Sequence, residues 1–248
     1  MDLGLSGRTA IVLGASQGMG LAIAAALRAE GAAVAMFARR RDVLEREAAR
    51  LGALAVPGDL TDPSDLRRLV DTAVERLGGV DVLVLNGGGP PPGPASGITT
   101  QDVEAAVALL LTPHVHLVAA CLPHLRASGR GRIVAIESTS VKEPIANLAL
   151  SNAVRPGVVG WLKTLARELG PEGITVNTVA PGRIDTERLQ ALYGAGGPGP
   201  EILAQIPARR LGRPAEIAAA VCFLASEQAA YISGSVVAVD GGMLSGLT

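Results

Sequence analysis

A glycine loop near the start of the chain is the feature that most constrains its fold. Residues 14–20 read Gly-Ala-Ser-Gln-Gly-Met-Gly and lie between a β-branched run and an apolar-periodic stretch. Strand, glycine loop and helix in this order predict a turn that cradles phosphate groups at the helix N-terminus. We expect Gly14 to make the tight turn, Gly18 to let the backbone approach a pyrophosphate, and Gly20 to let helix pack on strand. An ordinary tight turn between a strand and a helix is the alternative.

The composition of the chain limits what surrounds this loop. A length of 248 residues with 48% hydrophobic content predicts one α/β domain over 1–248. A net charge of −1 gives no electrostatic case for nucleic acid or for an anionic membrane surface. No apolar run reaches membrane-spanning length, and the first five residues lack the basic and apolar regions of a signal peptide. We therefore expect a cytoplasmic protein.

The two cysteines, Cys121 and Cys222, lie in apolar helical contexts. We interpret them as buried thiols in a reducing compartment, with neither a disulfide nor a metal site. His114 and His116 are two residues apart, so they would face different sides of a helix and would not form a metal pair. We expect no metal.

The apolar patterns predict an alternation of strands and helices. The strands are expected at 9–13, 33–37, 53–56, 80–85, 132–136, 174–179 and 236–239. Helices are expected at 21–27, 42–51 and about 101–127, with one more that begins at 63, one near 151 and one that ends at 224. Asp62 should cap the helix that Pro63 starts. Pro156 lacks the N–H of a helical residue and disfavours helical geometry at Arg155, so we expect that helix to begin late or to kink.

The second expected strand ends at Ala38-Arg39-Arg40. At this point of a dinucleotide-binding fold, an acidic side chain holds the 2′-hydroxyl of NAD, whereas arginine suits the 2′-phosphate of NADP. Arg39 and Arg40 offer fork-shaped donors to a phosphate, and no carboxylate stands at Ala38. The pattern favours NADP(H) and leaves NAD(H) as a second option. A solvated basic face at the start of the next helix is the alternative.

The spacing Gly-x-x-x-Gly-x-Gly resembles the short-chain dehydrogenase/reductase family. Further motifs extend the resemblance over essentially all of the chain: Gly-Asp-Leu at 58–60, Leu-Asn-Gly-Gly at 85–88, Pro-Gly-x-x-x-Thr at 181–186 and Val-Asp-Gly-Gly at 239–242. The tail segments resemble the 3-oxoacyl-carrier-protein reductase branch. The resemblance implies a single doubly wound Rossmann domain, with a parallel sheet of about seven strands in the order 3-2-1-4-5-6-7. It also implies a homo-oligomer, a tetramer or else a dimer, and a substrate lid at 187–210.

The resemblance further implies which residues bind the cofactor. Asp59 and Leu60 match the family's pair at the adenine, whereas Ile184 and Thr186 match residues that touch the nicotinamide carboxamide. The full expected set is Gly14, Ser16, Gln17, Gly18, Met19, Gly20, Arg39, Arg40, Asp59, Leu60, Asn86, Gly87, Gly88, Arg155, Pro181, Gly182, Ile184 and Thr186.

The expected catalytic residues Ser138, Ser151 and Arg155 depart in part from the family pattern. Ser138 matches the family's substrate-orienting serine, with a hydroxyl that only satisfies a strand end as the alternative. Ser151 and Arg155 stand where the family usually has a tyrosine and a lysine. A serine hydroxyl is shorter and less acidic than a phenol. Arg155 keeps the charge and ribose-binding part of lysine's role, but its pKa is too high for proton relay.

The proton donor is therefore an open question in the sequence. Leu110 aligns with a family asparagine that helps hold a relay water. The candidates are Tyr193 in the lid, Lys142 after the fifth strand, and an ordered water held by Ser138, Ser151 and Arg155. We favour the water, because it requires no lid movement.

Three functions fit these residues. The first is an NADP(H)-dependent oxidoreductase that acts on a carbonyl or alcohol of a small-molecule or acyl-carrier substrate. The second is a non-catalytic dinucleotide-binding sensor or partner subunit, and the third is a lyase or isomerase on the same scaffold. Fold alone does not choose among them.

Overall fold

The computed structural model describes residues 1–187, 189–190 and 198–247. Its centre is a seven-stranded parallel sheet in the order β3-β2-β1-β4-β5-β6-β7, as predicted. The strands are β1 (Thr9–Leu13), β2 (Ala33–Ala38), β3 (Leu54–Pro57), β4 (Val82–Asn86), β5 (Arg132–Ile136), β6 (Thr175–Pro181) and β7 (Val236–Val239). The doubly wound Rossmann fold is confirmed.

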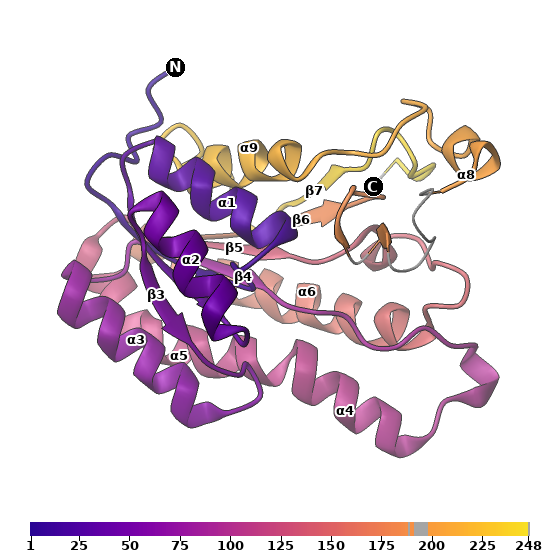
Figure 1. The fold of residues 1–248 in the computed structure, drawn as a ribbon, viewed down its shortest axis with the longest axis horizontal. Coiled ribbons are helices and arrows are strands. Elements are labelled where there is room, and N and C mark those ends of the chain that lie inside the picture. The colour runs from indigo at the N-terminus through magenta and orange to yellow at the C-terminus, as the bar shows by residue number, and fades with distance from the viewer. Residues whose placement is uncertain (188, 191–197, 248) are drawn as a thin grey trace.

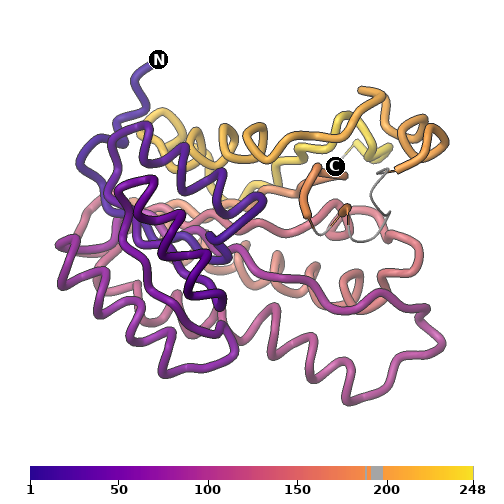
Figure 2. Tube along the Cα trace, viewed as in Figure 1, coloured from indigo at the N-terminus to yellow at the C-terminus, as the bar shows by residue number. Residues whose placement is uncertain are grey.

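Helices cover both faces of this sheet, and each face has its own apolar core (Figure 1). One face carries α1 (Gly18–Ala29), α2 (Arg41–Leu51) and α9 (Pro214–Ala225). The other carries α3 (Pro63–Leu77), α4 (Thr100–Leu110), α5 (Thr112–Ser128) and α6 (Ala149–Leu169). Figure 2 shows α1 and α9 side by side, although they come from opposite ends of the chain.

Short helices complete the connections: η1 (Ala95–Gly97), η2 (Thr139–Val141), η3 (Gly170–Glu172) and α8 (Pro200–Ala204). The strands β1, β4, β5 and β6 are buried at every residue. Burial on both faces explains why β1, β4 and β5 are nearly continuous apolar runs and not alternating ones. Cys121 and Cys222 are buried free thiols, as expected.

The helix expected at 101–127 is two helices, α4 and α5, which meet at Leu111. Taken as one segment, Thr100–Ser128 has the length and the apolar composition of a helix that could cross a membrane. The expectation that no apolar stretch reaches that length is therefore wrong. The core helix of a globular protein passes the same test, and here α4 packs on α6 while α5 packs on α3 and β4.

The expectation of a late start for the helix near Ser151 is also wrong. α6 begins at Ala149 and continues through Pro156 to Leu169. The Asn152 side chain fixes the loop before it, because its amide donates to the Ile145 carbonyl at 2.8 Å and accepts from the Ile145 N–H at 3.1 Å. The missing N–H of Pro156 removes one helical hydrogen bond without ending the helix.

Candidate active site

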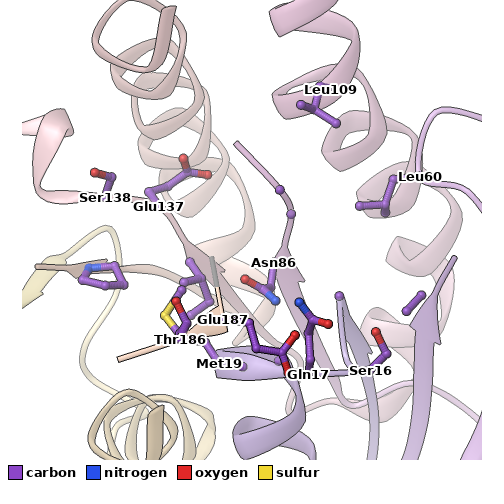
Figure 3. Close-up of a pocket in the computed structure, with 18 of the residues that line it drawn as sticks. Ser16, Gln17, Met19, Leu60, Asn86, Leu109, Glu137, Ser138, Thr186 and Glu187 are labelled. Atoms are coloured by element: carbon purple, nitrogen blue, oxygen red, sulfur yellow. The ribbon is translucent and has the colours of Figure 1, made fainter. Parts of the chain in front are cut away.

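A cavity of about 650 Å³ lies at the carboxyl ends of the strands. Every residue that the sequence assigned to the cofactor or to catalysis lines it. Figure 3 shows Ser16 and Gln17 on one side of this cavity, Glu137 and Ser138 on the other, and Asn86 between them. Ligands of open α/β sheets bind at this edge.

The glycine loop has the backbone geometry that a phosphate cradle needs. Gly14 and Gly18 have φ angles of +59° and +56°, a region that favours glycine. A Cβ on Gly20 would overlap the Gly14 carbonyl, and a Cβ on Gly14 would lie 2.8 Å from Nδ2 of Asn86. Gly14 and Gly18 are therefore required for their backbone conformation, and Gly20 for its close contact with the Gly14 carbonyl.

The start of α1 is open toward the cavity. Its N-cap residue, Gln17, makes no side-chain capping bond, and Gln17 Oε1 is buried without a partner among the described residues. The first N–H groups of a helix have no partners within it and favour anions. An anionic group such as a pyrophosphate fits this end of the cavity.

The arginines predicted to bind a phosphate line the same cavity, as does Asp59, which is close enough to feel the charge of Arg39. Arg40 lies 4.0 Å from Glu187, a carboxylate that the sequence analysis did not assign to the site. Hydrogen bonds from the backbone and hydroxyl of Thr61, with a contribution from the charge of Arg39, lower the pKa of Asp59. Asp59 therefore stays ionised and fixes its own turn.

Asn86 joins the two central strands at the cavity floor. Its amide donates to the Leu13 carbonyl at 3.0 Å, which links the end of β4 to the end of β1. At the other side, a Cβ on Gly182 would lie 2.7 Å from Cα of Asp240. Gly182 thus lets the end of β6 pack on the closing Val-Asp-Gly-Gly motif.

The three predicted catalytic residues belong to one network. The Arg155 guanidinium donates from Nε to Ser151 Oγ at 3.1 Å and from Nη2 to the Gly88 carbonyl at 3.0 Å. Ser151 Oγ lies 3.3 Å from Ser140 Oγ, and Ser138 Oγ accepts from the Ser140 N–H at 3.1 Å. Ser151 and Arg155 are both buried.

Two further ionisable residues that were not predicted from the sequence, Glu137 and His114, lie beside this network. Arg155 Nη1 donates to Glu137 Oε2 at 2.8 Å, and His114 Nδ1 lies 4.0 Å from Glu137 Oε1. Burial raises the pKa of Glu137 to about 6, against the opposing charge of Arg155. Burial, and then Arg155, lower the pKa of His114 to about 4. The available signal was an acidic residue directly after an apolar strand.

The remaining candidates lie elsewhere. Leu109 lines the cavity, whereas Leu110, the residue aligned with the family's asparagine, is buried in the core. Lys142 is exposed and outside the cavity wall. His114 and His116 do face different sides, since only the first is buried.

Tyr193 lies outside the described residues, as does much of the expected lid at 187–210. Of that segment, Glu187 and Leu189 line the cavity. Across residues 1–187, 189–190 and 198–247, no group of three or more His, Cys, Asp or Glu side chains could hold a metal ion.

Comparisons with known proteins agree with this architecture. A family model described as Enoyl-(Acyl carrier protein) reductase matches residues 14–244. The 3-oxoacyl-(acyl-carrier-protein) reductase FabG of Vibrio cholerae is 36% identical over 97% of this chain and 99% of its own length. The 3-oxoacyl-(acyl-carrier-protein) reductase MabA of Mycobacterium tuberculosis is 38% identical over 95% of this chain and 92% of its own length.

Solved structures extend the comparison. The L-sorbose reductase of Gluconobacter frateurii, complexed with NADPH and L-sorbose, superposes with a TM-score of 0.92 at 32% identity and full coverage of both chains. An NADPH-bound short-chain oxidoreductase of Pseudomonas aeruginosa PAO1, described as containing an atypical catalytic center, has a TM-score of 0.92 at 30% identity, over 98% of this chain and 99% of its own. The chain therefore belongs to the short-chain dehydrogenase/reductase family of oxidoreductases.

Proposed function

We propose that this protein is an NADPH-dependent reductase that reduces the carbonyl group of a small-molecule or acyl-carrier-linked substrate. The observation that carries the proposal is the single cavity that joins the glycine cradle, two arginines and the Ser138–Ser151–Arg155 network. The curated relatives are named as 3-oxoacyl reductases, and the solved neighbours were obtained with NADPH. NADPH would supply a hydride, and the chain's own residues must place the substrate and deliver a proton.

The cofactor preference rests on the end of β2. Arg39 and Arg40 line the cavity with no carboxylate at Ala38, so a 2′-phosphate would find two guanidinium groups there. Glu187 competes for Arg40, which leaves Arg39 as the stronger determinant. NADP(H) is the expected cofactor, with weaker binding of NAD(H).

Substrate orientation falls to Ser138. Its oxygen already accepts from the Ser140 N–H, so its hydroxyl hydrogen can donate to a carbonyl oxygen in the cavity. Ser151 accepts from Arg155, so its hydroxyl hydrogen can likewise donate outward. The two serines and the guanidinium present donors to the oxygen that becomes negative during reduction.

The proton that completes the reduction comes, in this proposal, from an ordered water held by Ser138, Ser151 and Arg155. Arginine does not release a proton at neutral pH, but its charge lowers the pKa of a water beside it. A solved neighbour bound to NADPH is likewise described as containing an atypical catalytic center.

The test measures the rate of NADPH consumption with a short 3-oxoacyl thioester and compares it with the rate of NADH consumption at the same cofactor concentration. We expect turnover with NADPH, and loss of most of it in Ser138→Ala. If Ser138→Ala, Ser151→Ala and Arg155→Ala all keep the wild-type rate, the assignment of the active centre is wrong.

A non-catalytic NADPH-binding protein is the second candidate. The observation that favours it is the engagement of Ser151, whose oxygen is already bonded within the protein and whose side chain is buried. Tight NADPH binding without turnover over a broad panel of carbonyl compounds would select this reading.

We also propose a cytoplasmic homotetramer, or else a dimer. β7 is the edge strand of the sheet and is only partly buried, and Phe223 of α9 beside it is 38% exposed. Apolar surface of this kind is typically covered by symmetric assembly. Light scattering should show the oligomer at micromolar concentration, and a monomer there would contradict it.

A further inference from the structure

Glu137 is a buried acidic residue in the cavity wall that the proposed reduction does not use. It follows the last residue of β5, and its side chain has no exposed area. Its backbone N–H is bonded to the Val179 carbonyl of β6 at 2.9 Å, which fixes the start of the side chain. An ionised carboxylate in such a place requires a paired charge, because burial opposes ionisation.

The guanidinium of Arg155 is that paired charge. One nitrogen binds Glu137 at 2.8 Å, the second binds Ser151 at 3.1 Å and the third binds the Gly88 carbonyl at 3.0 Å. Acceptors after β5, on α6 and in the loop after β4 therefore fix both the position and the plane of the guanidinium. Of the three, Glu137 supplies the charged acceptor, and charge-assisted bonds are the strongest.

His114 of α5 lies on the other side of the same carboxyl group. Its Nδ1 is 4.0 Å from Glu137 Oε1, and both atoms are buried without hydrogen-bond partners among the described residues. Since burial lowers the pKa of His114 to about 4, the imidazole is neutral at pH 7 and does not compensate Glu137. Arg155 of α6 and His114 of α5 are the ionisable groups that face this carboxyl, and Arg155 alone of the two carries charge.

We propose that Glu137 is a positioning residue for the reduction: its ionised carboxylate holds the Arg155 guanidinium against Ser151 and the cavity, and its protonation releases that guanidinium. The inference rests on the proposed function for its catalytic meaning. The ion pair itself is a property of the chain and is testable without a cofactor.

The pH range of this release follows from the burial of Glu137, which raises its pKa to about 6. Above that pH the ion pair is formed, and below it the carboxyl group is protonated. A pKa raised from the ordinary 4.5 also means that the folded state binds this proton more tightly than the unfolded chain does. The stability that this group contributes is therefore present below pH 4.5 and is lost as the pH rises through about 6. Activity and stability move in opposite directions across this range.

The first experiment uses the cofactor-free protein. We expect the Tm of the wild type, minus the Tm of Glu137→Gln, to increase as the pH falls from 7 to 5, because only the wild type takes up the proton. Carbon-13 NMR of labelled glutamate should show the Glu137 carboxyl titrating near pH 6. Glu172→Gln is the matched control, since Glu172 pairs with Arg126 on the exposed surface and its Tm difference should stay constant over this range. A Glu137 carboxyl that titrates at or below its ordinary pKa overturns the proposal.

The second experiment measures kcat against pH with NADPH and a short 3-oxoacyl thioester. The wild type should lose activity below about pH 6, and Glu137→Gln should lack that inflection and be about tenfold slower at pH 7.5, as expected when a charge-assisted bond becomes neutral. Glu137→Asp keeps the carboxylate and should keep the inflection. A wild-type rate and profile in Glu137→Gln overturns the positioning role. If the wild type itself shows no turnover, the proposed function fails separately, and the titration alone decides whether Glu137 holds Arg155.

Discussion

The two ends of the cavity are built in different ways. The cofactor end depends on backbone: the positive φ angles of Gly14 and Gly18, the close contact at Gly20, and open N–H groups at the start of α1. The substrate end depends on side chains that meet from separate elements, with Arg155 at their centre. A backbone cradle tolerates little change, whereas a side-chain network can exchange its members together. This difference explains how the chain keeps the family's glycine loop while it lacks the tyrosine and lysine of the substrate end.

The largest expected effect comes from rebuilding the substrate end. Ser151→Tyr with Arg155→Lys and Glu137→Gln should raise the reduction of a short 3-oxoacyl thioester by about 10²–10⁴-fold, the usual contribution of a positioned general acid. Glu137 is replaced because its carboxylate would draw the lysine away from the ribose and neutralise it. Steady-state kcat with NADPH measures the gain.

The matched control is the double variant Ser151→Tyr with Arg155→Lys, in which Glu137 is retained. Its kcat should increase less than that of the triple variant. Leu109→Asn is the further change to add, because Leu109 and not Leu110 lines the cavity. If the rebuilt variant binds NADPH normally and stays inert, the site has diverged beyond its proton donor, and the non-catalytic alternative gains.

The next effect concerns the cofactor end. Gly20→Ala should weaken NADPH binding by about 10²-fold, roughly 3 kcal/mol, because its Cβ would overlap the Gly14 carbonyl and shift the cradle. Fluorescence titration measures the Kd. The control is Gly79→Ala, since a Cβ there meets nothing within 4 Å and the residue lies outside the cavity. An unchanged Kd in Gly20→Ala would break the contrast between the two ends.

A smaller effect is expected at the phosphate-binding arginine. Arg39→Ala should weaken NADPH binding at least about tenfold and leave NADH binding unchanged, because a charge-assisted contact is worth roughly 1.5–3 kcal/mol. Arg46→Ala is the control, because Arg46 lies on the exposed face of α2 and pairs with Glu47. Equal affinity of the wild type for NADPH and NADH would show that Arg39 does not bind the 2′-phosphate of NADPH.

Local patterns predicted the strands, and the resemblance to the family implied their order and most of the residues of the cavity wall. A buried parallel strand is recognisable as an apolar run, and the end of each strand marks the ligand edge. The pairing of Glu137 with Arg155 and His114 was not predicted. It joins two helices and a strand end, and no local pattern shows which way an acidic residue at a strand end will point.

Two helix boundaries also differ from those predicted. Pro156 predicted a late start of α6. The helix begins at Ala149 instead, after a loop that the Asn152 side chain holds through two hydrogen bonds to Ile145. The expected single helix at 101–127 breaks at Leu111, and Pro113 stands in the first turn of α5, where proline is favoured. The break therefore has a local signal in the sequence, whereas the start of α6 follows a loop that Asn152 holds by hydrogen bonds to Ile145.

The Asn86 hydrogen bond to Leu13 has a consequence for how the chain folds. It spans 73 residues, and a Cβ on either Gly14 or Gly20 would lie 2.8 Å from Nδ2 of Asn86, so the glycine loop fits closely around this amide. We therefore expect β4 to pair with β1 before the glycine loop takes its binding shape, and contacts of such long sequence separation form slowly. Dinucleotide binding should appear late in refolding, after most of the helical circular dichroism signal has returned. The change in cofactor fluorescence during refolding would then report the time at which the central sheet is complete.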